Sequence, residues 1–528
     1  MNRDEDQPAP PPKPAAPDAE APPTHEEVRA LLAARRAKLD RLRTEMGVQP
    51  FGTRQAGLES LASARAKFDE AAHLEFAAKG PDRRGGVRVA GRVVQHRDMG
   101  KIVFCWLRDD SGDLQVSVSR ADVSEAEFAL AKMLDYGDIV AAAGKVGRTQ
   151  RGEVCVWATG LSMQCKSLAT PPGKWHGLSD PEIRYRQRSV DMYANPETLR
   201  TFAARSRIVS FIRRFMEQRG FLEVETPMLQ AVAGGAAARP FVTSHNALSL
   251  SLYLRIAPEL YLKRLLVGGM RRVFEINRNF RNEGVDRSHN PEFTALEAYE
   301  AFGDSGTMME LTESLLHELA VAEASATGAA GTVLPFGELQ IDYARPFVRV
   351  SWEELFQKAL GFAASDAAAV RTRAASEGIA QAQTAEPWLL ASELFDRHAE
   401  AGIDPARPTF VVDWPSAISP LTRPRAERPE VADRWDIFIG GMEIGPAYTE
   451  LNDPDLQRQR FTEQLAGMDA EARTMRSLDE DFLTALEVGM PPAGGLGLGI
   501  DRIVMLMTNR PSIRDVILFP LMRPQEPA

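Results

Sequence analysis

Five short segments between residues 86 and 168 alternate apolar and polar side chains, and this pattern constrains the fold more than any other feature. Glycines or aspartates separate the segments, which span 87–96, 101–109, 113–119, 138–147 and 153–163. Alternation with period two predicts β-strands that are buried on one face. Segment 124–134, between the third and fourth strands, reads as a helix. This order is typical of a small oligonucleotide-binding (OB) barrel, and another small β-barrel is the alternative.

The rest of the chain divides into segments of distinct composition. Residues 1–24 hold eight of the 35 prolines and too little apolar surface to fold, so we expect a disordered tail. The other expected segments are an N-terminal helical segment at 25–85, the barrel at 86–168, a linker at 169–190 and a larger domain at 191–526. The last one mixes helix-like and strand-like patterns without regular βαβ alternation, which favours an α+β domain on an antiparallel sheet.

Apolar residues recur at helical spacing between residues 26 and 46, which predicts an amphipathic helix. The other face of this helix carries Arg29, Arg35, Arg36, Lys38, Arg41 and Arg43. That face is either solvated over a packed stripe, or it contacts nucleic-acid phosphates.

Charge and cysteine content exclude several classes of protein. The chain has 63 Lys and Arg against 73 Asp and Glu, a formal net charge of −10, so it is not a general nucleic-acid-coating protein. Its three cysteines form no CxxC pair, which argues against a disulfide framework. The sequence contains neither an apolar run of transmembrane length nor the apolar core of a signal peptide. We therefore expect a soluble, cytoplasmic protein without membrane contact.

The stretch from 272 to 304 is the densest in residues that can carry chemistry. Its two halves alternate in polarity and flank a loop of turn-forming residues, which predicts a hairpin. The alternation groups Glu275, Asn277, Asn279 and Arg281 on one face of the first strand, and Phe293, Ala295, Glu297 and Tyr299 on one face of the second. Inward charges need partners, which favours a binding site. A solvent-exposed face with ordinary salt bridges is the alternative.

Two further segments carry candidate groups. The run GGLGLGIDR at 494–502 predicts a turn into a helix, where Arg502 and backbone N–H groups could meet a phosphate. Asp436, Glu443 and Glu450 lie seven residues apart among apolar strand residues, which suits a hard cation or a cationic ligand. The alternatives are a structural helix start and a solvated strand edge.

Together these segments resemble the class II lysyl-tRNA synthetases over roughly residues 26–525. GFLEVETPML at 220–229 resembles the first class motif, FRNE at 280–283 with HNPEFT at 289–294 the second, and GLGLGIDRIVML at 495–506 with IRDVILFP at 513–520 the third. Three further segments resemble the sequence signature of the lysine-specific enzymes: GGAAARPF at 234–241, LYLRIAPELYLKRL at 252–265 and AYTELNDP at 447–454.

The resemblance implies an N-terminal OB-fold barrel followed by a class II catalytic domain. It also implies a ligase that activates L-lysine with ATP and Mg²⁺, passes the lysyl group to the 3′ hydroxyl of tRNA(Lys), and forms a homodimer. One alternative is a paralogue that attaches lysine or β-lysine to another acceptor. Such a paralogue would lack the anticodon-type barrel. The other is a tRNA-binding protein with an impaired active site.

By resemblance, two arginines are catalytic. Arg281 would bridge the substrate carboxylate and the α-phosphate, and Arg502 would hold the γ-phosphate. The resemblance also implies that Phe293 stacks on adenine, that Glu283 accepts from its amino group, and that His289 lies near the distal phosphates.

The amino-acid pocket is likewise implied by the resemblance. Glu297, Glu450 and Tyr299 would bind the lysine ε-ammonium, and Glu259 the α-ammonium, with the backbone of Gly235 nearby. Carboxylates in a closed pocket select a diammonium substrate, because an uncharged analogue leaves them unpaired.

Two positions near this pocket depart from the family pattern. Asp436 and Glu443 match the family's metal ligands, but Asp436 stands where the family has Glu. Pro446 stands where the resemblance implies an Asn that holds the substrate carboxylate, so we expect one hydrogen bond fewer.

The resemblance gives the barrel a role in reading the anticodon. Phe104 would stack on an anticodon base, while Gln115 and Glu153 would read base edges. Burial of Phe104 in the barrel core is the alternative.

Overall fold

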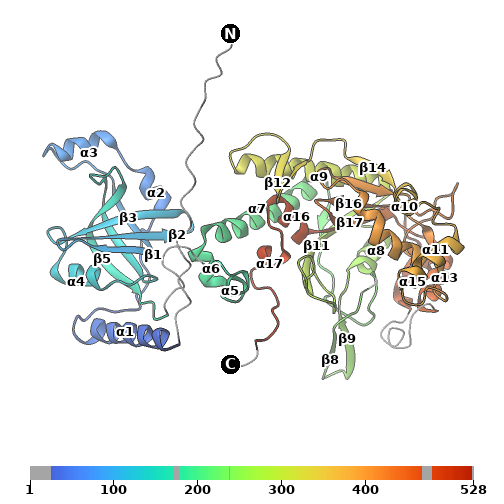
Figure 1. Cartoon of the computed structure of the whole chain (residues 1–528), viewed down its shortest axis with the longest axis horizontal. Coiled ribbons are helices and arrows are strands. Elements are labelled where there is room, and N and C mark those ends of the chain that lie inside the picture. The colour runs from blue at the N-terminus through green and yellow to red at the C-terminus, as the bar shows by residue number, and fades with distance from the viewer. Residues whose placement is uncertain (1–24, 170–177, 237, 467–477, 526–528) are drawn as a thin grey trace, which may run out of the picture. The chain divides into compact units, whose positions relative to one another are not determined.

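The computed structural model describes residues 25–169, 178–236, 238–466 and 478–525. The expected tail at 1–24 and residues 170–177 of the expected linker lie outside them. The chain forms two compact units, of which the first comprises Met1–Ser179 with Tyr193–Pro196, and the second Asp180–Met192 with Glu197–Ala528. Figure 1 shows the helices and strands of each unit.

The first unit contains a closed five-stranded barrel with strand order β1-β2-β3-β5-β4. The strands are β1 (Gly86–Asp98), β2 (Ile102–Asp109), β3 (Gly112–Ser119), β4 (Ile139–Arg148) and β5 (Val154–Cys165). Helix α4 (Glu125–Met133) follows the third strand, and a capping box of Ser124 and Glu127 starts it. The predicted OB-type barrel with its single inserted helix is therefore confirmed.

Three helices precede the barrel: α1 (His25–Thr44), α2 (Leu61–Ala66) and α3 (Glu70–Ala77). Leu39 and Leu42 of α1 are buried. Arg35 donates to the carbonyls of Tyr136 and Ser167, and Lys38 pairs with Asp135. These two basic side chains of α1 therefore bind other parts of the first unit.

The second unit is built on an eight-stranded sheet with order β14-β15-β16-β17-β18-β11-β10-β6. Pairing is antiparallel from β15 to β10, and the two edge strands pair in parallel. The expected antiparallel sheet is therefore confirmed. Its strands are β6 (Leu222–Glu223), β10 (Arg272–Phe280), β11 (Glu292–Ala301), β14 (Val348–Ser351), β15 (Thr409–Val412), β16 (Arg434–Ile439), β17 (Met442–Thr449) and β18 (Ala493–Gly499).

Helices cover the two faces of this sheet unequally. The largest core joins one face to α7 (Pro196–Gln218), α9 (Ser305–Ala326) and α16 (Ile500–Met507). Leu296 and Ala298 of β11 belong to that core, whereas Tyr299 and Ala301 pack with α8 (Glu259–Val267) and α15 (Glu480–Gly489). The polar residues of β11 identified above therefore lie on the α8 side.

The remaining elements surround this sheet. Helices α10 (Trp352–Leu360), α11 (Ala367–Ser376) and α12 (Pro387–Leu394), with the turns η1 (Phe395–Ala399), η2 (Glu400–Gly402) and η3 (Ser416–Ile418), accompany a separate apolar core. Small sheets pair β7 (Leu229–Gln230) and β8 (Val242–His245) with β9 (Leu250–Leu254), and β12 (Val333–Phe336) with β13 (Leu339–Asp342). The other helices are α5 (Pro181–Arg186), α6 (Arg188–Ala194), α13 (Pro454–Ala466) and α17 (Ile513–Val516). Within the described ranges, none of the helices has the length and apolarity needed to cross a membrane.

Candidate active site

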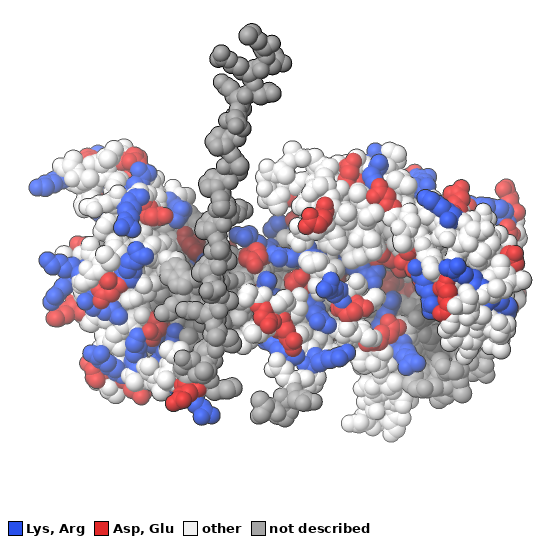
Figure 2. Space-filling model, in the orientation of Figure 1, with Lys and Arg blue, Asp and Glu red and all other residues white. Residues whose placement is uncertain are grey.

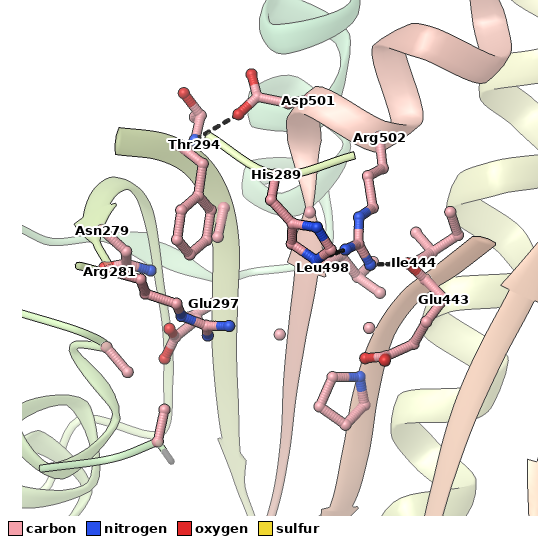
Figure 3. Close-up of a pocket in the computed structure, with 18 of the residues that line it drawn as sticks. Asn279, Arg281, His289, Thr294, Glu297, Glu443, Ile444, Leu498, Asp501 and Arg502 are labelled. Carbon is pink, nitrogen blue, oxygen red and sulfur yellow. Dashed lines mark hydrogen bonds between the residues drawn. The ribbon is translucent and has the colours of Figure 1, made fainter. Parts of the chain in front are cut away.

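A pocket opens beside β10, β11, β17 and β18, near the starts of α8 and α16 (Figure 3). The sequence-predicted residues that line it are Gly235, Glu259, Arg281, Glu283, His289, Phe293, Glu297, Tyr299, Glu443 and Arg502. Glu450 and Asp436 are buried and do not line the pocket.

The predicted hairpin forms one wall of this pocket. In the antiparallel pairing of β10 and β11, Glu275 lies opposite Glu297 and Asn279 opposite Phe293. The residues assigned to one face of each strand thus form a single surface. Glu275 and Glu297 are only 4% and 7% exposed, so the alternative of a solvent-exposed hairpin face is wrong.

Arg281 follows β10 directly, and the carboxylates of Glu283, Glu443 and Glu297 act on its charge without forming an ion pair with it. Its guanidinium carbon lies 5.0 Å from the centre of the Phe293 ring. Within the described parts of the chain it forms no ion pair, and its Nε has no hydrogen-bond partner. Burial lowers the pKa of Arg281, although a guanidinium still keeps its proton. An anion in the pocket would supply the missing partner.

Arg502 provides a second cation, in the first turn of α16. It donates to the backbone carbonyl of Glu443 and approaches Nε2 of His289 at 3.3 Å (Figure 3). The Nδ1 atom of His289 lies 2.8 Å from Asp286. A neutral imidazole with its proton on Nδ1 fits both contacts. These side chains gather at the start of a helix, where backbone N–H groups also favour anions.

The other end of the pocket is acidic. Glu259 is the first residue of α8 and accepts from the hydroxyl of Tyr448 at 2.8 Å, while Glu297 accepts from Tyr299 at 3.2 Å. Burial, followed by the charge of Glu259, raises the pKa of Glu297 to about 8. Burial also raises the pKa of Glu450 well above its usual value. A cation that enters this end would restore the ionised forms.

Lys263 of α8 lies among these carboxylates. Its Nζ is 2.6 Å from Glu259 Oε1 and also pairs with Glu450. Lys263 and Glu450 are both fully buried. Glu450 therefore already has an internal cation, a partner that the sequence analysis did not predict.

Glycines allow the close contacts in this pocket. A Cβ at Gly495 would collide with the Glu450 carboxylate and lie 2.5 Å from Cε1 of Tyr299. Gly235 has a φ of +86°, and a Cβ there would lie 3.1 Å from that of Ala257. Glycine has no Cβ, so it fits the crowded position 495 and adopts the positive φ at position 235 without strain.

Asp436 and Glu443, the predicted metal ligands, have different environments. Both oxygens of Asp436 accept from Arg434, at 2.8 and 2.7 Å. Glu443 opens to the pocket, and its pKa is raised by the surrounding protein atoms and by the charge of Asp436. The described residues contain no group of three or more His, Cys, Asp or Glu side chains suited to a metal ion. Pro446 pairs with Asp436 across β16 and β17 and lines the pocket.

The predicted anticodon readers lie in the first unit. Phe104 is half-exposed, because Val103 and Cys105 take the inward positions of β2, so the core alternative for Phe104 is wrong. Gln115 of β3 is 5% exposed, and its Oε1 is buried without a hydrogen-bond partner. Glu153 is exposed just before β5.

Three side chains that support the site were missed by the sequence analysis: Lys263, Arg434 and Asp501. The first lies one helical turn after Glu259, and the second two strand positions before Asp436, so spacing alone could have identified both. Asp501 accepts from the backbone N–H of Thr294 at 2.7 Å and pairs with Arg205 at 2.6 Å, which ties α16 to β11 and α7. It joins residues that are far apart in sequence, so no local pattern reveals it.

Comparisons with known proteins point in one direction. A family model described as tRNA synthetases class II (D, K and N) matches residues 180–523, and one described as an OB-fold nucleic acid binding domain matches residues 87–169. A lysine–tRNA ligase from Pelotomaculum thermopropionicum is 46% identical over 506 residues, which cover 95% of this chain and 96% of the relative. Proteins of the same name from Cronobacter sakazakii and Escherichia coli K12 are 49% and 45% identical. They match 83% and 93% of this chain, and 86% and 96% of their own lengths.

Proposed function

The chain belongs to the class II tRNA synthetases and, within them, to the lysine–tRNA ligases, and we propose that the pocket of Figure 3 is its site of lysine activation. The enzyme activates L-lysine with ATP and charges tRNA(Lys). Because translation enzymes of this kind act in the cytoplasm, we assign the chain to that compartment.

One observation carries the assignment of the site: a single pocket is lined both by buried carboxylates and by two arginines that form no ion pair with the described residues. The carboxylates are those of Glu259 and Glu297, and the arginines are Arg281 and Arg502. Lysine carries two ammonium groups, and ATP carries several negative charges. The pocket is therefore electrostatically complementary to this pair of substrates.

In the first step, a carboxylate oxygen of lysine attacks the α-phosphorus of ATP. The bond from that phosphorus to the bridging oxygen breaks, and pyrophosphate leaves with the electron pair. We assign Arg281 to the carboxylate and the α-phosphate, because its guanidinium lines the pocket and its buried Nε has no hydrogen-bond partner there. Holding both anions in line and neutralising them lowers the barrier without a protein nucleophile.

The remaining ATP contacts follow from the same geometry. We assign Phe293, which lies beside Arg281, to stacking on adenine, and Glu283 to its amino group. Arg502 and His289 are assigned to the distal phosphates at the start of α16.

For the amino acid, we assign Glu297, Tyr299 and Glu450 to the ε-ammonium. Glu259 and the backbone of Gly235 are assigned to the α-ammonium. Glu297 supports this role most strongly, because its carboxylate lines the pocket and burial makes its charge costly until a cation pairs with it. Glu450 would share its charge between the substrate and Lys263.

Class II lysine–tRNA ligases generally use ATP with Mg²⁺. Glu443 fits such an ion, because its carboxylate faces the pocket and its pKa is raised. Asp436 fits as a direct ligand only if Arg434 releases it, so we assign it to electrostatic support of Glu443. A bound Mg²⁺ would neutralise phosphate charge.

In the second step, the 3′ hydroxyl of the terminal adenosine of tRNA attacks the lysyl carbonyl carbon. AMP leaves, and the hydroxyl gives up its proton. We propose that the barrel at 86–168 selects the tRNA, with Phe104 stacked on an anticodon base and Gln115 and Glu153 at base edges. Phe104 supports this, because its ring is not buried in the core of the barrel.

We also propose a homodimer formed through the segment that follows α7. Leu222, Met228, Leu229, Val242 and Leu250 expose between 47% and 55% of their surface. The β8–β9 hairpin among them has no Lys, Arg, Asp or Glu and is white in Figure 2. An apolar surface of this kind is typical of an interface. Light scattering behind size-exclusion chromatography would give twice the mass of 58.2 kDa.

Lysine-dependent ATP–pyrophosphate exchange by Glu297→Gln tests the assignment of the site. The substitution removes a buried charge that pairs with lysine, so we expect KM for lysine to rise by about tenfold or more while KM for ATP stays unchanged. Glu318→Gln, on an exposed ion pair with Arg219, is the matched control and should change neither constant. Equal loss of lysine and ATP use in Glu297→Gln would contradict the assignment.

A further inference from the structure

Lys263 is a buried charged group without a role in the chemistry described so far. It lies one turn into α8, and its side chain has no exposed surface. Its Nζ is 2.6 Å from Glu259 Oε1, pairs with Glu450, and lies 5.6 Å from the centre of the Tyr448 ring. Lys263 therefore contacts two carboxylates of the proposed lysine pocket but does not line the pocket itself.

The two carboxylates keep this ammonium charged. Burial by itself would lower the pKa of Lys263, but the charges of Glu259 and Glu450 outweigh burial and raise it. The converse also holds, because Lys263 is the nearest cation to Glu450 and favours its ionised form. The three groups form one electrostatic unit.

The charge of the amino-acid end can be counted from its members. Glu259, Glu297 and Glu450 contribute three negative charges when ionised, and Lys263 contributes one positive charge. Tyr299 and Tyr448 stay neutral, because burial raises both pKa values well above the usual range. Two net negative charges remain, which equals the number of ammonium groups on lysine.

We propose that Lys263 is a specificity-determining positioning residue, whose buried ammonium sets the amino-acid end to the charge that a diammonium substrate neutralises. The inference rests on the proposed lysine pocket. Lys263 acts through Glu259 and Glu450, which it holds in place and partly neutralises. Without Lys263, the pocket carries three negative charges against the two ammonium groups of lysine. If one carboxylate is removed and Lys263 is kept, the pocket carries only one net negative charge.

This charge count predicts that the effect of one substitution reverses in another background. Lys263→Gln alone leaves an unmatched carboxylate, so we expect KM for lysine to rise by about tenfold. Glu450→Gln alone leaves the Lys263 ammonium less neutralised, so KM for lysine also rises. The double variant Lys263→Gln/Glu450→Gln restores two net negative charges, and its KM for lysine should be lower than that of Glu450→Gln. A purely structural lysine would make the double variant worse than Glu450→Gln.

The experiment is lysine-dependent ATP–pyrophosphate exchange by the full-length chain and these three variants, with KM for lysine and for ATP measured separately. Lys263→Arg keeps the charge and should retain more lysine affinity than Lys263→Gln. Lys358→Gln, on the exposed face of α10, is the matched control and should leave both constants unchanged. Circular dichroism melts report whether each variant is folded.

The outcomes separate this inference from the proposed function. A lower KM for lysine in the double variant than in Glu450→Gln, with KM for ATP unchanged, supports the role of Lys263. An active unsubstituted enzyme whose double variant has the same or a higher KM than Glu450→Gln overturns the role of Lys263 alone. An unsubstituted enzyme without lysine-dependent exchange overturns the proposed function and this inference together.

Discussion

We expect Glu297 to set how lysine binding depends on pH. Burial and the charge of Glu259 raise its pKa to about 8, while the hydrogen bond from Tyr299 opposes them and Glu275 and Arg255 contribute smaller effects of opposite sign. Lysine pairs with the ionised form, so Glu297 must lose a proton on binding below this pKa. We expect KM for lysine to rise by up to about tenfold for each pH unit as the pH falls from about 8 to about 6.

Exchange kinetics at saturating ATP would measure this dependence. Glu297→Gln has no proton to lose, so its KM for lysine should be high at every pH in this range. The same slope in both proteins would mean that another group controls the titration.

We expect Pro446 to weaken the binding of the lysine carboxylate. The ring lines the pocket at the position where the resemblance implies an Asn, and it offers no donor to the substrate carboxylate. Pro446→Asn supplies an amide, so we expect KM for lysine to fall by roughly fivefold, the value of one hydrogen bond. Pro446→Ala is the control, because it removes the ring without adding a donor. If Ala lowers KM as much as Asn does, the amide has no part in binding.

Strand β18 shows how an element limits the site. Gly495 of this strand lies opposite Tyr299 of β11 and against the Glu450 carboxylate. Gly495→Ala overpacks this contact, so we expect the free energy of unfolding to fall by about 1–3 kcal/mol and KM for lysine to rise. At Gly497 of the same strand, an added Cβ would have no neighbouring atom closer than 3.7 Å. Gly497→Ala should therefore cost less stability. Urea denaturation of both variants compares them, and equal losses would contradict the packing argument.

Local periodicity predicted the elements of the site better than their long-range contacts. The faces of β10 and β11 followed from alternation, because successive side chains of a strand point to opposite faces of the sheet. Asp436 was predicted to be a metal ligand, and that prediction did not include Arg434, which donates to both of its oxygens. The bond between Asp501 and Thr294 joins residues 207 positions apart, and no local pattern encodes such a contact.

At the scale of the whole molecule, the proposed sites of lysine activation and of tRNA selection lie in different units. Phe104 lies on the barrel and the lysine pocket on the other unit. Phe104→Ala should therefore lower kcat/KM for tRNA charging by about tenfold or more, the value of one stacked base, and leave pyrophosphate exchange unchanged. Leu74→Ala, at an exposed position of the same unit, is the control. An equal fall in exchange would show that the barrel is not a separate reader.

The sequence predicted this architecture because both units have strong local patterns. Period-two alternation located the five barrel strands, and the mixture of helix-like and strand-like segments indicated the α+β unit. It did not predict the strand order of the eight-stranded sheet, where β18 lies between β17 and β11. That order depends on packing between distant segments, which single-chain periodicity does not report.

ATP–pyrophosphate exchange on the purified chain shows whether the pocket activates L-lysine. The panel should contain L-lysine, β-lysine, ornithine and arginine, each with ATP and Mg²⁺. We expect strong exchange with L-lysine and much weaker exchange with the other three. Exchange with none of them, or exchange with β-lysine that matches or exceeds that with L-lysine, would overturn the assignment of this pocket to L-lysine.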